Sequence, residues 1–199
     1  MFRTALISMF LTSTALADTW IVDDDGKADF DNIQAAVDAA SDGDEIVVLP
    51  GTYTTSTADE VVDMLGKEVW LHSSAGAGVT IIDGEQTRRG ILCNNNETVN
   101  TIIEGFTITN CYSNSGGGMY NYYSNPTLTN CTFTNNTTDG KGGGMYNYLF
   151  SLPALTNCTS TDNTANYGGG MLNDDSSPTL TDCTFTANTP NDDGAMRNV

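Results

Sequence analysis

Two pairs of tyrosines, 26 residues apart, have the residue type and spacing of a sugar-binding surface. Tyr120 and Tyr122 recur as Tyr146 and Tyr148 within two identical MYNY strings. Side chains alternate between the two faces of a strand, so inward methionines would place the tyrosines outward in two stacked pairs. Phenol rings can stack on sugar rings while their hydroxyl groups form hydrogen bonds. The pattern predicts a glycan-binding surface or, as the alternative, tyrosines that only support one another across neighbouring strands.

Threonines form a second regular array. Four Thr-x-Thr triplets would place two outward threonines on each of four neighbouring strands. Spacings of about 4.8 Å between strands and roughly 7 Å along a strand resemble the flat faces of β-helical antifreeze proteins. Threonine is also a favourable exposed strand residue, so ice binding ranks below sugar binding as a hypothesis. The eight positions are Thr107, Thr109, Thr132, Thr134, Thr159, Thr161, Thr184 and Thr186.

The residues suited to acid–base chemistry are few. Arg88 and Arg89 are adjacent and follow Asp83 and Glu85, so an arginine could act as a base beside carboxylates. Surface charges in a turn explain the same pattern. The only histidine, His72, has no serine or cysteine nucleophile motif beside it and is expected at the rim of a strand. We predict no catalytic residue.

Short acidic runs are the candidates for a cation site. The run Asp23–Asp25 lacks the ligand spacing of an EF-hand loop, which needs a glycine at the sixth position and a glutamate at the twelfth. A loosely bound Ca²⁺ stays open there, at Asp174-Asp175 and at Asp192-Asp193, and solvated acidic turns are the alternative. No resident metal or cofactor is predicted.

The five cysteines do not form a zinc motif, because there is no CxxC pair and no second histidine. Three of them recur in one repeat phase and are expected to stack in the core as small apolar groups. Neighbouring strands about 4.8 Å apart would allow a disulfide by distance, but parallel side-chain directions argue against one. The cysteines are Cys93, Cys111, Cys131, Cys158 and Cys183.

The elements that position these residues are three consecutive 26-residue repeats, at 116–141, 142–167 and 168–193, with a truncated coil at 194–199. Short alternating runs separated by Gly, Asn, Asp and Pro are typical of short strands. We predict an all-β, three-faced, single-stranded parallel β-helix. Its faces carry Met119, Met145, Met171 and Met196 on one side, Leu128, Leu155 and Leu180 on a second, and Cys131, Cys158 and Cys183 on a third.

Asparagines that recur in register are expected to form hydrogen-bonded ladders at the turns. One ladder contains Asn121, Asn147, Asn173 and Asn198, and the other contains Asn136, Asn163 and Asn188.

The same phasing predicts that the solenoid occupies residues 44–199. The string at 101–105 repeats that at 80–84 after 21 residues, the strings that begin at Glu45 and Glu68 lie 23 residues apart, and Ile91 falls on the methionine face. Because the chain ends just after another coil begins, we expect either a fragment or an exposed last coil.

One helix is predicted, from Asn32 to about Ala40, within an N-terminal segment of residues 18–43. Asp31 and Gln34 fit the Asp variant of a capping box. Apolar side chains at 33, 36, 37 and 40 would form one face. The helix is expected to cap the first coil and its unpaired strand edges.

Residues 1–17 have the basic start, short apolar core and small-x-small end of a secretory signal peptide. No other apolar run approaches the roughly 20 residues of a membrane helix, so no span is predicted in the mature chain. A net charge of −18 opposes nucleic-acid binding, which depends on basic patches.

Several of these strings resemble a known family. Residues 29–37, 43–53 and 81–84 resemble the opening of pectin-lyase-like right-handed β-helix proteins, and the PTLTNCTF and GGGM strings are similar to repeats of secreted bacterial β-helix proteins and of polymorphic outer-membrane proteins and related adhesins. The resemblance implies that the predicted parallel β-helix is right-handed. It also implies that a lyase member would use a basic residue as base and acidic residues to hold calcium, whereas the motif strings of the esterase and hydrolase members are absent.

We therefore predict a secreted, non-catalytic right-handed β-helix protein that acts as an adhesin-like or glycan-binding module at the cell surface. Its expected partner is a polysaccharide or a cell-surface glycan. The alternative is a pectate lyase-like enzyme that uses Arg88 or Arg89, and ice binding through the threonine array ranks below it.

Overall fold

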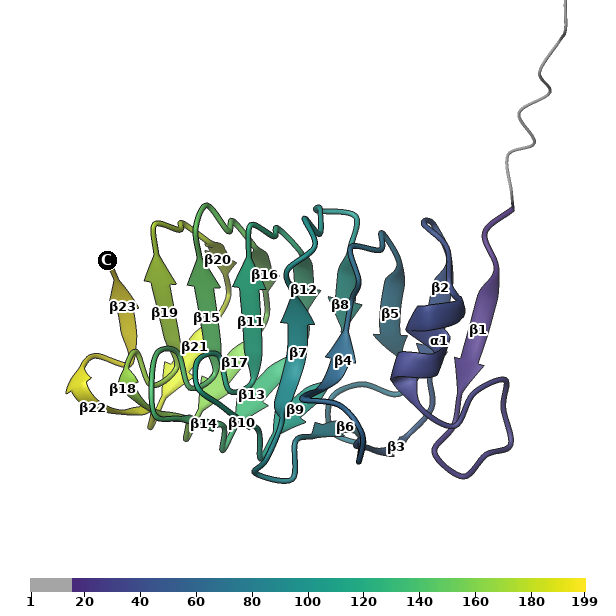
Figure 1. Cartoon of the computed structure of the whole chain (residues 1–199), viewed down its shortest axis with the longest axis horizontal. Helices are drawn as coiled ribbons and strands as arrows, with labels where there is room; N and C mark the ends of the chain where they lie inside the picture. The colour runs from purple at the N-terminus through teal and green to yellow at the C-terminus, as the bar shows by residue number, and fades with distance from the viewer. Residues whose placement is uncertain (1–15) are drawn as a thin grey trace, which may run out of the picture.

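The computed structural model describes residues 16–199 and shows a parallel β-solenoid of about seven turns (Figure 1). The predicted signal peptide at residues 1–17 lies almost wholly outside the described residues. The all-β prediction is confirmed, with a single short helix in the part of the chain that is described.

Strands stack into three long parallel sheets, one for each face of the solenoid. The leucine sheet contains, in order, β1 (Thr19–Val22), β2 (Glu45–Val48), β5 (Trp70–Ser73), β8 (Ile102–Glu104), β12 (Thr127–Thr129), β16 (Ala154–Thr156) and β20 (Thr179–Thr181). The threonine sheet contains β3 (Gly51–Tyr53), β6 (Thr80–Asp83), β9 (Thr107–Thr109), β13 (Thr132–Thr134), β17 (Thr159–Thr161) and β21 (Thr184–Thr186). The methionine sheet contains β4 (Glu60–Asp63), β7 (Arg89–Cys93), β11 (Met119–Tyr122), β15 (Met145–Tyr148), β19 (Met171–Asp174) and β23 (Met196–Asn198).

A fourth, shorter sheet appears in the C-terminal coils and was not expected from three repeat phases. It consists of β10 (Tyr112–Ser113), β14 (Thr137–Thr138), β18 (Thr164–Tyr167) and β22 (Thr189–Asp193). These strands lie in the segment between the threonine and methionine sheets, where the polar sequence gives no clear alternation.

The methionine and leucine faces are confirmed by strand register. Met119 pairs with Met145 and with Ile91, and Leu128 pairs with Leu155. These side chains are buried, while the residues between them point outward, as the two-residue period of a strand requires.

The glycine run that opens each repeat is required by close approach between coils. A Cβ atom added to Gly144 would lie 2.4 Å from the carbonyl oxygen of Gly170, and one added to Gly118 would meet Gly144 at the same distance. Only glycine allows the backbones to stack at this point.

The third predicted face needs correction. Cys131, Cys158 and Cys183 do not lie in strands but at the corner just before β13, β17 and β21, and we call this row the thiol ladder. The preceding residues, such as Asn130 with φ of 55°, are left-handed and turn the chain there. The inward residues of the threonine sheet are instead those in the middle of each strand, such as Phe133 and Ile108.

Asparagine ladders are present, but the first one lies inside strands rather than at turns. Asn121 donates to Asn147 at 2.8 Å and Asn147 donates to Asn173 at 2.7 Å, all within the buried side of the methionine sheet. The second ladder lies at a corner, where the Asn163 side chain accepts from the Asn136 backbone N–H at 2.9 Å. Interior amides are tolerated here because each supplies the partner that the next coil needs.

Three expectations about the upstream coils are wrong. Residues 80–84 belong to the threonine sheet and residues 101–105 to the leucine sheet, so they do not stack, because the same Thr-Ile-Ile-acid-Gly string fits either face. Ile46 pairs with Leu71, an offset of 25 residues rather than the expected 23. The leucine sheet also starts before residue 44, because β1 pairs with β2.

Helix α1 (Ile33–Ala39) covers the edge of β4 and packs on β1 and β2 near the N-terminal end (Figure 1). The predicted apolar face is buried. The predicted cap is wrong, because Asn32 rather than Asp31 is the N-cap and accepts from the Ala35 N–H at 2.8 Å. Gln34 does not reach back; it binds both backbone groups of Asp63 on β4 and so covers that strand edge.

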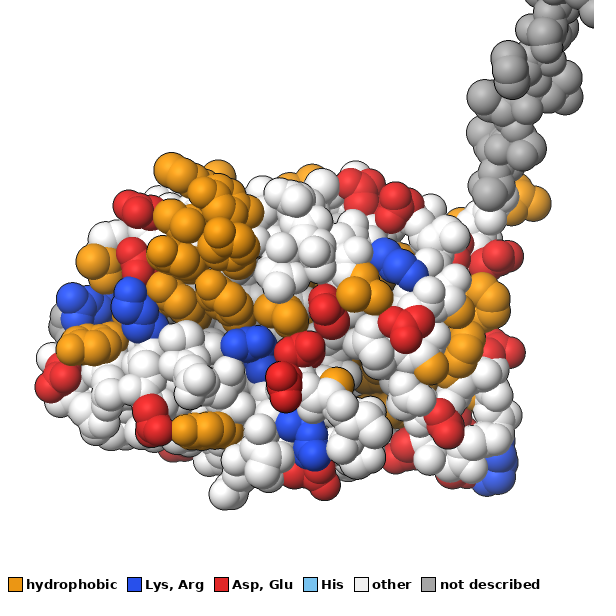
Figure 2. Space-filling view, viewed as in Figure 1, with side chains coloured by type: hydrophobic (Ala, Val, Ile, Leu, Met, Phe, Trp, Pro, Cys, Tyr) orange, Lys and Arg blue, Asp and Glu red, His pale blue; other side chains and the backbone are white. Residues whose placement is uncertain are grey.

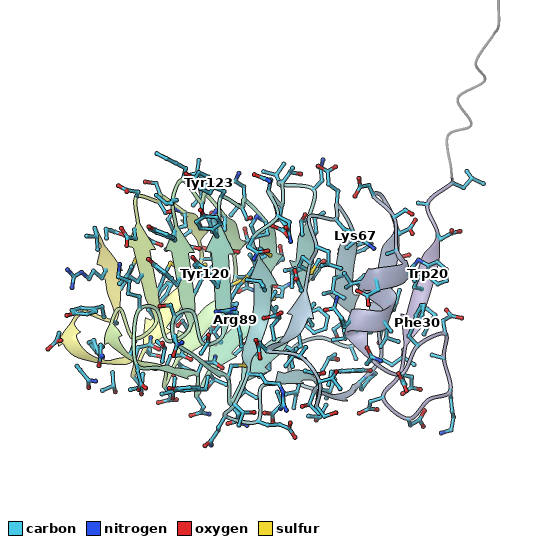
Figure 3. All side chains as sticks on the ribbon, in the orientation of Figure 1. Trp20, Phe30, Lys67, Arg89, Tyr120 and Tyr123 are labelled. Atoms are coloured by element: carbon cyan, nitrogen blue, oxygen red, sulfur yellow. The ribbon has the colours of Figure 1, made fainter. Side chains whose placement is uncertain are left out.

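The other end of α1 is held by Lys67, whose ammonium group lies beside the helix (Figure 3). Its Nζ donates to the carbonyl oxygens of Val37, Asp38 and Ala40 at 2.5, 2.8 and 2.7 Å. A cation at a helix C-terminus satisfies carbonyls that have no partner in the helix. Lys67 therefore ties the helix to the coil that follows it.

We predict that Asn147→Ala destabilises the protein by about 2–4 kcal/mol, since it leaves the Asn121 donor and the Asn173 acceptor buried without partners. Urea unfolding followed by circular dichroism measures the loss. Asn191→Ala is the matched control, because Asn191 donates to Asn166 in an exposed pair, and it should cost little. Equal effects of both substitutions would contradict the role of the buried ladder.

The buried carboxyl group of Asp44 should make the stability of the protein depend on pH. Burial raises the pKa of its carboxyl group, but the backbone N–H groups of Ser41 and Asp18 and the indole N–H of Trp20 outweigh burial, so the pKa is lowered in the folded state. A lowered folded pKa stabilises the protein above the unfolded value of about 3.9, and this contribution is lost as pH falls through the folded pKa.

Asp44→Asn should therefore reduce stability at pH 7, and the difference from the unsubstituted chain should shrink below about pH 4. Urea unfolding between pH 2 and 7 measures both. The exposed Asp192→Asn serves as the charge-matched control. A difference that stays constant across this range would show that Asp44 acts without its charge.

Candidate functional site

Six aromatic side chains form a continuous surface on the outer side of the methionine sheet and at the turns that follow it. Tyr120 stacks on Tyr146 with ring centroids 5.3 Å apart, and Tyr122 lies 5.8 Å from Tyr148 on the neighbouring strand. The large apolar patch in Figure 2 covers this region of β11 and β15. We call it the aromatic face; it consists of Tyr120, Tyr122, Tyr123, Tyr146, Tyr148 and Phe150.

The two predicted tyrosine pairs are present, but their four rings are not equally accessible. Tyr146 is only 5% exposed, because Lys141 lies over its ring and its hydroxyl donates to Asp174 at 3.0 Å. Burial and the Asp174 carboxylate raise the pKa of Tyr146. Lys141 also forms an ion pair with Asp174 at 2.5 Å, and this lowers the pKa of the carboxyl group. Tyr146 is therefore a supporting residue of the aromatic face. Tyr122 and Tyr148 are half-buried, so part of each ring is accessible.

Two accessible aromatic residues lie outside the strands, where strand alternation does not predict them. Tyr123 and Phe150 lie at the turns after β11 and β15, where they are 42% and 65% exposed. Tyr123 packs edge-on against Tyr122 at 4.8 Å and lies 6.1 Å from Phe150. Figure 3 shows Tyr123 at the turn, away from Tyr120 on the strand. Their backbones have φ of 50° and 57°, a left-handed conformation that favours glycine or asparagine.

Arg89 lies at the N-terminal side of the aromatic face, with its guanidinium over the Tyr120 ring at 5.2 Å (Figure 3). It donates to the Ser113 hydroxyl and to the carbonyls of Ser115 and Gly116, and its Nη1 lies 3.7 Å from Glu60. Burial lowers the pKa of Arg89. Arg88 pairs with Glu85 at 2.7 Å across an exposed turn. The two guanidinium groups thus contact different partners.

The sequence profile of the right-handed β-helix region matches residues 67–195, which is more than half of the chain. The chain belongs to the right-handed β-helix family. The predicted handedness and the three-faced solenoid are thereby confirmed. A comparison with curated proteins finds no match.

The threonine array lies in register on the second sheet of the β-helix. Thr132 pairs with Thr107 and with Thr159, and Thr134 pairs with Thr109 and Thr161; Thr184 and Thr186 continue the two rows. Some of the threonine hydroxyl groups form hydrogen bonds within the protein. The Thr107 hydroxyl, for example, donates to the Ala77 carbonyl oxygen at 2.7 Å. The rows continue around the corner, because Thr127 and Thr129 point outward on the leucine sheet.

His72 lies on the outer side of the leucine sheet, stacked on Trp70 at 4.1 Å and paired with Glu45 at 2.9 Å. The Trp70 indole donates to Glu104 at 3.2 Å. These contacts involve no serine or cysteine, and His72 is separated from both Arg89 and the aromatic face because it lies on another sheet.

The acidic runs do not converge on a cation position. Within residues 16–199, no group of three or more His, Cys, Asp or Glu side chains is arranged to hold a metal ion. Asp24 accepts from the Thr52 N–H at 2.9 Å, and Asp174 is engaged by Lys141.

The five cysteines are free thiols. In the described residues there is also no helix long and apolar enough to cross a membrane.

Proposed function

We propose that this β-helix is a non-catalytic extracellular or cell-surface module that binds glycan on the accessible part of its aromatic face. The binding residues are Tyr122, Tyr123, Tyr148 and Phe150. Their rings lie 4.8–6.1 Å from their neighbours, so they form one platform rather than isolated side chains. Aromatic platforms stack on the apolar faces of sugar rings, and tyrosine hydroxyls add hydrogen bonds.

The single observation that carries the proposal is the backbone at Tyr123 and Phe150. Bulky residues in the left-handed region cost roughly 1–2 kcal/mol each. The third repeat has Asp175, with φ of 50°, at the position of Tyr123, and asparagine or aspartate adopts this conformation at lower cost; in the second repeat Leu149 holds that position and Phe150 is an additional left-handed residue after it. Exposed rings that strain the backbone and bury little surface contribute to something other than folding.

The surroundings of the platform suit a hydroxyl-rich ligand. Lys141, Tyr167, Leu172 and Arg197 line a hollow of about 190 Å³ at its C-terminal side. Charged donors beside aromatic rings are the usual means by which proteins fix the orientation of a bound sugar. The Lys141–Asp174 pair also holds Tyr146 in place beneath the platform.

The non-catalytic part of the proposal rests on the contacts of the arginines. A base must reach a substrate proton, whereas three hydrogen bonds and the ring of Tyr120 engage the Arg89 guanidinium. The extracellular part rests on the leader-like sequence of residues 1–17.

We predict that Tyr123→Asn and Phe150→Asn weaken glycan binding at least about tenfold each, because interface aromatics contribute 1–2 kcal/mol or more. The same substitutions should leave the unfolding free energy unchanged or raise it by about 1 kcal/mol, because asparagine relieves the left-handed strain. Binding is measured on an array of neutral and acidic oligosaccharides and then by calorimetry with the best oligosaccharide. Urea unfolding gives the stability.

Tyr112→Ala is the matched control, because Tyr112 lies on the short sheet and its hydroxyl binds Asp139. It should not alter binding. Absence of any glycan ligand, or equal losses in Tyr112→Ala and Tyr123→Asn, would refute the proposal. Formation of unsaturated products from an acidic polysaccharide with calcium, abolished by Arg89→Ala, would instead establish a lyase.

A further inference from the structure

The outer surface of the threonine sheet consists of a single residue type over its four C-terminal coils. On β9, β13, β17 and β21 the middle residue points into the core, and the residues on either side of it point outward. All eight outward residues are threonine, and together they are the threonine array. Neighbouring strands pair residue by residue without a bulge, so the array consists of two rows in register.

The array ends where other residue types replace threonine. The next coil toward the N-terminus has Ile81 in one row and Asp83 in the other. The outer surface of the leucine sheet is also mixed, because His72 and Glu104 precede Thr129 in one of its rows. The chain has a net charge of −18, yet none of the eight positions of the array is charged. Exposed surfaces ordinarily carry roughly a quarter to a third charged residues, so solubility does not explain this composition.

Most hydroxyl groups of the array are available to the surroundings. Three of them, those of Thr107, Thr161 and Thr186, donate within the protein, at 2.7, 3.1 and 3.3 Å. The other five have no hydrogen-bond partner in the described part of the chain, so each can bind water or a ligand. These five hydroxyl groups belong to Thr109, Thr132, Thr134, Thr159 and Thr184.

Threonine side chains on a regular sheet form a grid of hydroxyl and methyl groups. Branching at Cβ restricts rotation about χ1, so the backbone largely determines where the two groups of each side chain lie. The backbone repeats about every 4.8 Å from strand to strand and roughly every 7 Å between alternate residues of one strand. Each point of the grid therefore offers one hydroxyl group and one methyl group.

A periodic grid fits a ligand that is itself periodic. Water beside a methyl group has restricted orientation, and water that is bound to a hydroxyl group is held in place. Because both groups recur at the same spacings, the bound water repeats with them, and these spacings are close to those between oxygen atoms on the faces of an ice crystal. A dissolved sugar fits less well, because no position of the array carries an aromatic ring for stacking.

We propose that the threonine array binds ice through water molecules that its hydroxyl and methyl groups order. Bound protein stops growth of the crystal face that it covers, so a crystal begins to grow only below its melting point. The array lies on a different sheet from the aromatic face, so this activity is independent of glycan binding.

The test measures thermal hysteresis, the gap between the melting and freezing points of a single ice crystal, with the full chain in solution. We expect a measurable gap and faceted crystals. Thr159→Lys should reduce the gap at least about tenfold, because the new side chain projects from the middle of the grid and its charge would lose hydration against ice. Circular dichroism checks that the variant folds.

Thr156→Lys is the matched control, because Thr156 is exposed on the same coil but lies on the leucine sheet, outside the array. It should leave the gap unchanged. Absence of thermal hysteresis at millimolar protein, or equal losses in the two variants, would overturn the proposal. Dimers that Thr159→Lys separates in a sedimentation experiment would also overturn it, since the array would then be an interface between two copies of the chain.

Should Thr159→Lys fail to fold, Thr134→Lys on the neighbouring strand must show the same loss, because the Thr134 hydroxyl also lacks a partner in the described residues. Retained thermal hysteresis in that variant overturns the proposal. Tyr123→Asn should leave thermal hysteresis unchanged, and Thr159→Lys should leave glycan binding unchanged. Failure of one proposal is thus distinguishable from failure of the other.

Discussion

Coil-to-coil register is the constraint on which the rest of this structure depends. Parallel stacking places each inward side chain directly against its equivalent on the next coil, so a row of interior amides can satisfy its hydrogen bonds by repetition. The amides of Asn121, Asn147 and Asn173 meet this requirement because each has both a donor and an acceptor. The row has one unpaired atom, Asn121 Oδ1, where the register partner on the preceding coil is Cys93. The hydrogen bonds of this row are thus complete except at Asn121 Oδ1, where the preceding coil has no asparagine.

The same constraint explains how much of the fold can be predicted from the sequence. A 26-residue period places the methionines and leucines on separate faces without further information, and their register agrees. Upstream, coils vary in length: Ile46 to Leu71 is 25 residues, but Leu71 to Ile103 is 32. Alternation shows which side chains point inward and does not show which sheet they join. The strings at 80–84 and 101–105 therefore look equivalent in the sequence, although they belong to different sheets.

The candidate site likewise contains residues that the sequence predicts and residues that it does not. Tyr120, Tyr122 and Tyr148 follow from the repeat and from strand alternation. The burial of Tyr146 does not, because Lys141 and Asp174 reach it from other parts of the chain. Tyr123 and Phe150 lie at corners where the repeats diverge, and nothing in a tyrosine or phenylalanine indicates a left-handed backbone. Side chains placed by the period are predictable, and those placed by turns or by long-range ion pairs are not.

Stacked coils also separate the parts of the molecule that carry stability from those that can vary. Each coil contacts mainly its neighbours, so a turn that departs from the repeat alters its own corner while the ladders beneath continue. Tyr123 and Phe150 occupy such corners: Asp175 takes the place of Tyr123 two coils later, and Phe150 is an additional residue in its own turn, while the register of the methionine sheet continues. The cost of one or two strained corners is small beside the buried rows that hold the sheets together. The outer corners can thus be specialised for a ligand, whereas the buried asparagine row depends on an amide at the same position of the next coil.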